Sequence, residues 1–389
     1  MEQYMEVIEV AVIGAGINGA SVARSLALRG AGVRVYDQGS VAAGPTARSS
    51  AVCRAYYTNE FLARVAYDSL EVFRNFAGHT NGRDCGYRQN GILYLHPTED
   101  LVQLNQVAAM LTSIGTRVEI LEGEDLARLA EGFDLDGIAA GAWEIDAGYA
   151  DPVNASQGLL EHAVELGAET RLYTRIVDLA PGAGGGALLT TSDGGTVHAR
   201  KVVLCVGPWT RHMAGKLGVD LPLTAERHLI ATFAWGGARP ISFSYADMVN
   251  GFYVKPDGTE LFIVGSLLPG EVVDPDNFDH TLGFDEQLDF AANLQRRVPP
   301  LDQADARAGW AALYDLSPDW QPVIGEIEDG VYVTAGTSGH GFKLAPALGK
   351  YIADLVCGNP DPGLVQFHPR RFAEHHELAA GFGRARILG

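Results

Sequence analysis

The sequence predicts an α/β protein in which a Rossmann-type dinucleotide-binding domain carries an inserted α+β domain with a mixed or antiparallel sheet. Three observations lead to this prediction. Residues 7–36 follow the pattern of a strand, a glycine-rich turn, a helix and a second strand. Apolar runs typical of buried strands return at 201–206 and 331–335, far along the chain. Residues 221–266 read as short antiparallel strands joined by turns.

The N-terminal segment carries the most informative pattern. Apolar residues 7–13 predict a buried strand that runs into Gly14-Ala-Gly16-Ile17-Asn-Gly19. In a dinucleotide site the first glycine allows a tight turn, the second lets the backbone approach a pyrophosphate, and the third lets the following helix pack closely. The helix N-terminus then offers free N–H groups and a positive dipole end to the phosphates. A glycine-rich loop that binds nothing is the alternative interpretation of these glycines alone.

The residues after the glycines favour the dinucleotide interpretation. A predicted helix over 20–29 is followed by a predicted strand over 33–36, and that strand ends at Asp37. A carboxylate at this position accepts hydrogen bonds from a ribose 2′-hydroxyl. A 2′-phosphate needs a basic residue instead, so Asp37 favours FAD or NAD over NADP.

Composition excludes several classes of partner. The net charge of -19 argues against nucleic acid and anionic membrane surfaces. The four cysteines lie far apart without metal-site spacing, which predicts free thiols in a reducing cytoplasm and no metal. The N-terminus lacks the apolar region of a signal peptide, and no run approaches the roughly 18 apolar residues of a membrane span. We therefore expect a cytoplasmic protein.

Periodicity divides the rest of the chain into elements and domains. Helices are predicted over 61–76, 99–114, 122–130, 152–166, 284–297 and 343–357. Further strands are predicted over 169–179, 229–235, 251–255 and 261–266. We assign the dinucleotide-binding domain to residues 1–90, 150–220 and 305–389, and the substrate domain to residues 91–149 and 221–304.

Four motifs together resemble a known family. They are the glycine fingerprint, Arg48-Ser49-Ser50-Ala51-Val-Cys-Arg54-Ala-Tyr56-Tyr57, Cys205-Val-Gly207-Pro-Trp209, and Gly336-Thr-Ser-Gly-His-Gly-Phe-Lys343 preceded by Asp319-Trp-Gln-Pro. With these residues the chain resembles the FAD-dependent amine and amino-acid oxidoreductases of the D-amino-acid oxidase superfamily. It is most similar to the branch of sarcosine oxidase, sarcosine dehydrogenase and enzymes that oxidise N-methyl or cyclic amino acids. The resemblance spans nearly the whole chain and implies FAD as cofactor, with Gly207 and Trp209 beside it.

The second motif combines a polar loop with a single arginine. Arg48, Ser49 and Ser50 belong to a loop of small and polar residues whose donors can wrap the pyrophosphate and the polar rim of the flavin; an ordinary turn is the alternative. Arg54 stands between an apolar pair and two tyrosines, of which Tyr57 is a candidate lining residue. An arginine in this setting pairs with a buried acid or holds a ligand carboxylate. The resemblance assigns Arg54 to the substrate carboxylate.

The fourth motif places a glycine-rich turn between a buried strand and a helix, so that the helix N-terminus can face the flavin. The expected cofactor-binding residues here are Gly336, Ser338, Gly339, Gly341, Phe342 and Lys343. The dipole disfavours a cation such as Lys343 in the first helical turn, and the resemblance implies that Lys343 also binds the substrate carboxylate. His340 is either a catalytic base or, as we favour, a hydrogen-bond donor near the flavin.

The predicted hairpin of the substrate domain supplies further candidates. Tyr253 and Lys255 share one face of a strand by alternation, and the resemblance places a tyrosine such as Tyr253 over the flavin. A tyrosine that only packs across strands is the alternative. Phe252 and Trp310 are further candidate lining residues.

The sequence departs from the resembled family in two places. Relatives with covalent flavin carry a cysteine just after the pair that aligns with Ala311-Ala312, where this chain has Leu313-Tyr314-Asp315. We therefore expect noncovalent FAD. The oxidases also carry a lysine and a histidine on the strand that matches 261–267, whereas this chain has Ile263 and apolar neighbours. This difference favours a dehydrogenase, which reacts slowly with oxygen and passes electrons to another acceptor.

The expected function is oxidation of the C–N bond of a small amino acid, with a secondary, N-methyl or cyclic amine, by hydride transfer to flavin N5. The resulting imine is then hydrolysed. One alternative is oxidation of a 2-hydroxy acid or a polyol phosphate, which needs a general base such as His340. Another is a flavin subunit that relays electrons within a complex. The sequence leaves oxygen or another electron acceptor, and a homo-oligomer, open as partners.

Overall fold

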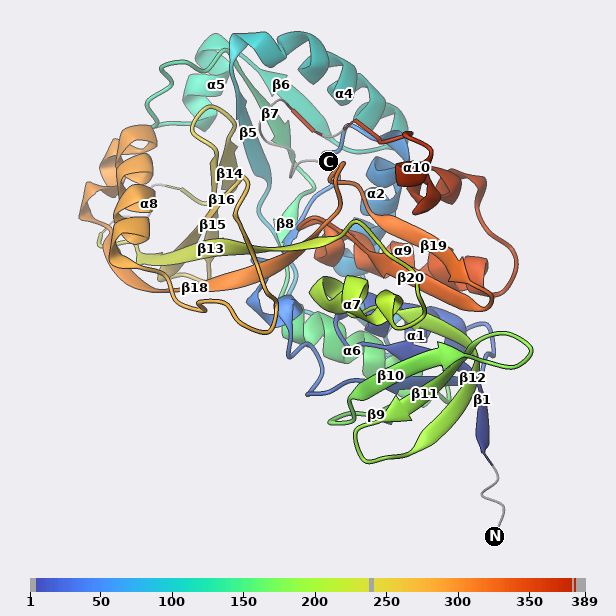
Figure 1. Cartoon of the computed structure of the whole chain (residues 1–389). Helices are drawn as coiled ribbons and strands as arrows, with labels where there is room; N and C mark the ends of the chain where they lie inside the picture. Colours follow the sequence, from blue (N-terminus) through green and yellow to red (C-terminus); the bar gives the residue numbers. More distant parts are fainter. Residues whose placement is uncertain (1–4, 238–240, 380, 383–389) are drawn as a thin grey trace.

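The structure is a computed structural model that describes residues 5–237, 241–379 and 381–382. Two large β-sheets and one small sheet organise these residues, with helices packed against them (Figure 1). The small sheet consists of three strands in the order β3 (Val52–Cys53), β8 (Gly148–Tyr149) and β4 (Arg88–Gln89). The mixture of sheets and helices confirms the predicted α/β class.

The first large sheet has eight strands and a parallel centre. Its parallel strands are β1 (Glu6–Ile13), β2 (Val33–Tyr36), β9 (Glu169–Arg171), β12 (Thr196–Leu204) and β20 (Val331–Ala335). Antiparallel strands are β10 (Ile176–Pro181), β11 (Ala187–Thr191) and β19 (Val323–Glu328). β1 pairs with β2 on one side and with β12 on the other, and the C-terminal part of β12 pairs with β20. The parallel strands thus place their carboxyl ends along one edge.

Continuous apolar runs explain why these strands form a buried sheet. Val10–Ile13 and all of β2 and β20 are buried, as expected for parallel strands covered on both faces. The principal covering helices are α1 (Ile17–Ala27), α2 (Glu60–Arg74), α6 (Pro152–Glu165) and α9 (Gly341–Val356). α1 and α9 pack tightly, since a Cβ on Gly349 would stand 2.2 Å from Ser21 Oγ. The Ser21 hydroxyl donates a hydrogen bond to the Ala345 carbonyl at 2.6 Å.

The second large sheet has nine strands and is mostly antiparallel. Its strands are β5 (Ile92–His96), β6 (Val118–Leu121), β7 (Ala140–Glu144), β13 (Thr224–Ala234), β14 (Ser244–Asp247), β15 (Phe252–Asp257), β16 (Leu261–Ser266), β17 (Glu271–Val273) and β18 (Asp305–Leu316). The pair β14–β5 is parallel, so the sheet is mixed. The helices α4 (Leu101–Ile114), α5 (Gly123–Leu129) and α8 (Phe284–Arg297) lie beside it in Figure 1.

Local periodicity predicted the helices well and one strand badly. The seven predicted helices are confirmed within a few residues, with the one over 61–76 divided into α2 and α3 (Phe76–His79). The continuous strand predicted over 169–179 is wrong. The chain leaves β9 through Tyr173, whose φ is 55°, and forms β10 on the opposite side of the sheet, where β10 pairs with β11 rather than β2. The turn contains no glycine or proline, so no signal in the sequence marked it.

The division into two domains stays a prediction, and one pairing suggests a change to it. β18 lies within the range 305–389 that we assigned to the dinucleotide-binding domain, but it pairs along its length with β13 of the nine-stranded sheet. We therefore propose that residues 305–316 belong with the substrate domain.

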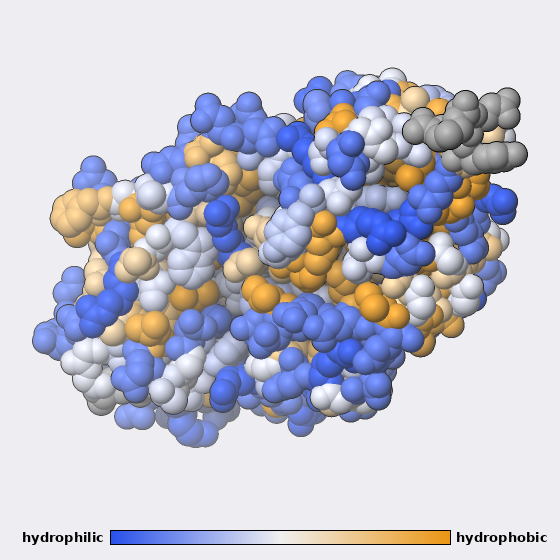
Figure 2. All heavy atoms as spheres, turned by 90° about the horizontal axis from the view of Figure 1, so that it is seen from below, coloured by the Kyte–Doolittle hydropathy of each residue, from blue (hydrophilic) through white to orange (hydrophobic). Residues whose placement is uncertain are grey.

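The surface seen in Figure 2 is largely hydrophilic, with apolar residues scattered over it and grouped near its middle. None of the helices in the described part of the chain has the length and apolarity needed to cross a bilayer. Three of the four free cysteines, Cys53, Cys85 and Cys205, are buried, whereas Cys357 is exposed.

Candidate active site

A cavity of about 450 Å³ opens at the carboxyl ends of β1, β2 and β12. This edge of a parallel sheet is the usual ligand-binding position in open α/β folds. Twelve of the predicted cofactor-binding residues line it, namely Gly14, Gly16, Ile17, Asp37, Arg48, Ser49, Ser50, Gly207, Trp209, Gly339, Gly341 and Phe342. The cavity wall therefore draws on early, middle and late segments of the chain.

The turn after β1 requires its glycines. Gly14 has a φ of 106°, and a Cβ there would stand 2.3 Å from the Cys205 carbonyl oxygen. A Cβ on Gly19 would stand 1.9 Å from the Gly14 oxygen, so this residue serves the packing of α1 and does not line the cavity. Gly16 precedes the first residue of α1. The backbone N–H groups at this helix end therefore face the cavity, as a pyrophosphate site requires.

The Asp37 carboxylate is oriented by the backbone around it. Its Oδ2 accepts a hydrogen bond from Ala15 N at 2.7 Å, and its Oδ1 accepts one from Gly39 N at 2.8 Å. A carboxylate has about four acceptor positions, so it can also accept from ribose hydroxyls. Its place on the cavity wall at the end of β2 fits the predicted role.

The loop after β2 continues the wall with small polar residues. A 3₁₀ helix covers Pro45–Arg48, and Ser49 and Ser50 follow it on the cavity wall. Sequence reasoning did not single out Thr46, whose Oγ1 accepts a hydrogen bond from Ile17 N at 3.3 Å. Thr46 thereby attaches the loop to the start of α1.

A segment that sequence reasoning missed entirely lies over the cavity. We call residues 274–282, between β17 and α8, the covering segment; it contributes the lining residues Pro275, Phe278 and His280. Trp209 Nε1 donates to Asp276 Oδ1 at 2.8 Å. The Arg227 guanidinium donates to two carbonyl oxygens of the segment at 2.8 and 2.5 Å. No local motif marks this segment, because its role depends on contacts with β13 and with the 205–209 turn.

The far end of the cavity is formed by β18 and the turn before α9. The rings of His228 and Tyr314 stack with centroids 3.9 Å apart. Tyr314 lies so close to Gly339 that a Cβ on this glycine would stand 2.6 Å from the ring. Thr337 donates from its Oγ1 to Asp315 Oδ1 at 2.9 Å, and burial raises the pKa of Asp315. The N-terminus of α9 is thereby held against the cavity.

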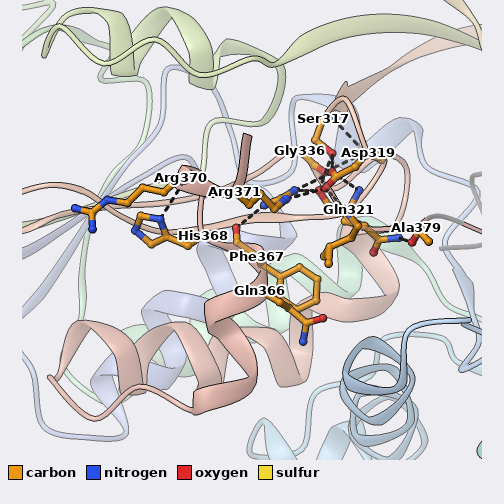
Figure 3. A network of polar contacts seen from close by, with 12 residues as sticks. Ser317, Asp319, Gln321, Gly336, Gln366, Phe367, His368, Arg370, Arg371 and Ala379 are labelled. Atoms are coloured by element: carbon orange, nitrogen blue, oxygen red, sulfur yellow. Dashed lines mark hydrogen bonds and ion pairs between the residues drawn. The ribbon is translucent and has the colours of Figure 1, made fainter. Parts of the chain in front are cut away.

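Gly336 and Ser338 shape this turn from outside the cavity. Ser338 has a φ of 49°, and its hydroxyl donates to the Gly336 oxygen at 3.0 Å. Ser317 N donates to Ser338 Oγ at 3.4 Å, which links the turn to the network drawn in Figure 3. Their role is therefore support of the backbone that does line the cavity.

The network in Figure 3 connects the C-terminal helix α10 (Arg370–Ala373) to this turn. The Arg371 guanidinium binds both carboxylate oxygens of Asp319, at 2.7 and 2.9 Å. Burial acts to raise the pKa of Asp319, but the hydrogen bonds and charge of Arg371, with the backbone N–H groups of Leu378 and Gln321, together outweigh it and the pKa lies below its ordinary value. Ser317 Oγ donates to the same carboxylate at 3.0 Å. Asp319, quoted in the fourth motif, thus has a structural role here.

The predicted substrate-binding residues gather beside the cavity. The Arg54 guanidinium is buried and lies 4.5 Å from the centroid of the Tyr57 ring. The rings of His340 and Tyr57 pack in a T-shaped arrangement, with centroids 5.3 Å apart. Lys343 Nζ donates to the Gly339 carbonyl at 3.0 Å. Burial, and secondly the charge of Arg54, lower the pKa of Lys343 well below its ordinary value. The charge of Arg54 therefore acts directly on the buried Lys343 amine.

The hairpin of β15 and β16 confirms the predicted alternation and corrects one residue. Tyr253 and Lys255 stand opposite Gly265 and Ile263 on the neighbouring strand. Tyr253 is hydrogen-bonded with Ser50 of the cavity wall, and burial raises its pKa. Phe252 does not line the site: it points to the other side of the strand and packs in the core against Tyr245, with centroids 5.9 Å apart.

Two further candidates, Lys255 and Trp310, do not line the cavity themselves. Lys255 Nζ donates to Asp257 Oδ1 at 2.9 Å and lies 4.4 Å from the centroid of the Tyr149 ring. Trp310 Nε1 donates to the Arg48 carbonyl at 3.0 Å, so it supports the loop after β2 rather than lining the cavity.

Comparison with known proteins identifies the family to which the chain belongs. The profile of the FAD dependent oxidoreductase (DAO) family matches residues 9–355. The chain belongs to this family. Within the DAO family it is 25% identical over 361 residues to a glycine oxidase from Geobacillus kaustophilus (strain HTA426), covering 90% of this chain and 92% of that protein. It is 27% identical over 388 residues to a monomeric sarcosine oxidase from Streptomyces avermitilis, covering 94% and 98%.

Solved structures agree on the fold. A crystal structure of an L-proline dehydrogenase from P. horikoshii superposes with a TM-score of 0.87 at 24% identity, covering 96% of this chain and all of that one. Membership of the DAO family confirms the expected FAD cofactor and the expected class of enzyme, a flavoprotein oxidoreductase with relatives that oxidise amino acids. The glycine turn, Asp37 and the cavity fit FAD.

Proposed function

We propose that this enzyme oxidises the carbon–nitrogen bond of a small amino acid that has a secondary, N-methyl or cyclic amine. The product is an imine, which water hydrolyses. When bound, FAD supplies the acceptor for the hydride that leaves the carbon, while the protein binds, orients and desolvates the substrate. The similarity to a glycine oxidase and to a sarcosine oxidase supports this substrate class.

The pair of Arg54 and Lys343 carries the proposal. Both side chains are buried, and the charge of Arg54 depresses the pKa of Lys343. Two cations in one desolvated site are costly unless an anion lies between or beside them. Glu144 offsets part of the Arg54 charge. A substrate carboxylate supplies a further anion, which favours the charged form of Lys343 and accepts hydrogen bonds in pairs from a guanidinium.

The amine half of the substrate then lies among aromatic side chains. Tyr57 is buried against Arg54, and Tyr253 is partly buried and hydrogen-bonded with Ser50 of the cavity wall. Hydride loss requires the neutral amine, and apolar surroundings lower an amine pKa because they disfavour the charged form. The site therefore needs no dedicated base. His340, whose ring packs in a T-shaped arrangement with Tyr57, serves the shape and polarity of this pocket.

The residues that hold FAD follow from the cavity wall. We assign Asp37 to the ribose, the turn at Gly14 and Gly16 with Ser49 and Ser50 to the pyrophosphate, and the start of α9 to the flavin. Gly207, Trp209, Ile17, Arg48, Gly339, Gly341 and Phe342 complete the wall.

The test is anaerobic reduction of the purified flavoprotein. We expect sarcosine- and proline-like amino acids to bleach the oxidised flavin absorbance, and amines without a carboxylate to bleach it far more slowly. Reduction by 2-hydroxy acids but by no amino acid would instead show C–O oxidation. Reduction that begins only after a partner protein is added would show an electron-relaying subunit.

A further inference from the structure

A buried acid stands behind the candidate carboxylate site. Glu144 is the last residue of β7, and its side chain is fully buried. Its Oε1 accepts a hydrogen bond from Ala55 N at 2.5 Å, and its Oε2 accepts one from the Tyr94 hydroxyl at 3.0 Å. The proposed reaction gives this residue no role, and sequence reasoning did not single it out.

The hydrogen bond to Ala55 connects Glu144 to the substrate site. Ala55 follows Arg54 directly, so the carboxylate fixes the chain segment that carries the guanidinium. The Arg54 charge in turn stabilises the ionised form of Glu144. A carboxylate buried in a sheet is costly without such compensation, so its presence here points to a purpose beyond packing.

We propose that Glu144 is a positioning residue for Arg54, and that its ionisation controls how strongly this guanidinium binds the substrate carboxylate. The inference rests on the proposed function. With Glu144 neutral, the positive charge of Arg54 is fully available to an anion. With Glu144 ionised, its negative charge offsets part of the positive charge of Arg54. The ionised Glu144 also repels the substrate carboxylate, which carries a charge of the same sign.

The surroundings of Glu144 place its titration near neutral pH. Burial raises its pKa to about 7, although the Ala55 N–H, Arg54 and Tyr94 all act to lower it. Asp146, which follows two residues later, acts to raise it. Three phenols that interact with Glu144, those of Tyr56, Tyr57 and Tyr87, have pKa values raised by burial. These phenols stay neutral across this range. The rings of His340, against Tyr57, and His96, against Tyr56, also lie in this cluster, so the variants below are needed to assign a transition to Glu144.

The sign follows from linkage. An anion bound beside Glu144 raises the pKa of that carboxyl, so binding takes up a proton. Affinity is therefore highest below about pH 7, falls as the pH rises through the pKa of the free enzyme, and levels off above that of the complex. Between about pH 6 and about pH 8 we expect the Kd to rise by about 5- to 20-fold.

Two matched variants separate Glu144 from Lys343, which also loses anion affinity when it deprotonates. Glu144→Gln keeps an oxygen for the Ala55 N–H and an amide N–H for the Tyr94 oxygen but removes the charge. Tyr94→Phe removes one hydrogen bond that lowers the Glu144 pKa and leaves the charge in place. Glu144→Gln should abolish the part of the pH dependence of anion affinity that Glu144 causes. Tyr94→Phe should move that transition to higher pH.

The experiment titrates propionate into the FAD-loaded protein across this pH range, with the flavin spectrum reporting binding. Calorimetry in two buffers of different ionisation enthalpy measures proton uptake. We expect uptake near pH 7 in the wild type and its loss in Glu144→Gln. Unchanged uptake and pH dependence in Glu144→Gln would overturn the inference.

If Glu144→Gln does not fold, Tyr94→Phe decides, since a transition that does not move contradicts the role of Glu144. Wild-type protein that binds no propionate at any pH, and is not reduced by amino acids, would instead remove the proposed function itself. Wild-type protein that is reduced by amino acids but whose propionate affinity does not vary with pH would overturn the inference alone.

Discussion

Gly14→Ala tests whether the cavity holds FAD as we infer. The residue has a φ of 106°, and its Cβ would stand 2.3 Å from the Cys205 carbonyl oxygen. The positive φ costs an alanine about 1–2 kcal/mol. The Cβ must also move by about 1 Å to reach ordinary van der Waals contact, which shifts the turn or the Cys205 segment. Both line the cavity.

The shift draws backbone N–H groups away from the pyrophosphate. A hydrogen bond to a charged group contributes about 1.5–3 kcal/mol, so loss of one such bond weakens FAD binding by about 10- to 100-fold. Titration of FAD into apoprotein, followed by the change in FAD fluorescence, measures this Kd. Thermal unfolding with and without FAD measures the accompanying loss of stability.

Gly30→Ala is the matched control. Gly30 also has a positive φ, 78°, but a Cβ there meets no atom of the described residues within 4 Å, and the residue does not line the cavity. It should lose about 1–2 kcal/mol of stability and keep its FAD affinity. Equal weakening of FAD binding in both variants, or none in Gly14→Ala, would refute the reasoning.

Three further predictions concern the chemistry. Arg54→Ala should lower kcat/KM for substrates with a carboxylate, by an amount that corresponds to about 2–5 kcal/mol of lost transition-state stabilisation, and should leave FAD content unchanged. Equal losses for amines without a carboxylate would show that Arg54 has a structural role. Acid or heat precipitation should release all the flavin, because Tyr314 stands near the place of the linking cysteine; a yellow pellet would contradict this. Substrate-reduced enzyme should react slowly with oxygen in stopped flow, because Ile263 cannot stabilise superoxide. Rapid reoxidation that Lys255→Met abolishes would make the protein an oxidase.

Sequence reasoning succeeded where the signal is local. The strand, turn and helix around Gly14 and the acid at Asp37 depend on neighbours within one βαβ unit, so their spacing alone predicted them. Alternation placed Tyr253 and Lys255 on one face, and the same rule applied strictly would have excluded Phe252.

The missed features depend on contacts between distant segments. The pairing of β18 with β13 and the position of the covering segment follow from tertiary packing, which no short period encodes. Glu144 ends an ordinary strand, and only the structure shows that its carboxylate meets the backbone next to Arg54. An acid at the end of an otherwise apolar strand was the available signal.

The order of strands in the parallel sheet also governs how the protein is made. β12 lies between β1 and β20, and the cavity wall needs both Gly14 and Gly341, which stand near opposite ends of the chain. Such non-local pairing delays folding, because loop closure must precede the contacts that reward it. During synthesis the nascent chain can begin its sheet early but cannot complete the FAD site until α9 has emerged from the ribosome. FAD should therefore enter at the last stage of folding and trap the finished structure.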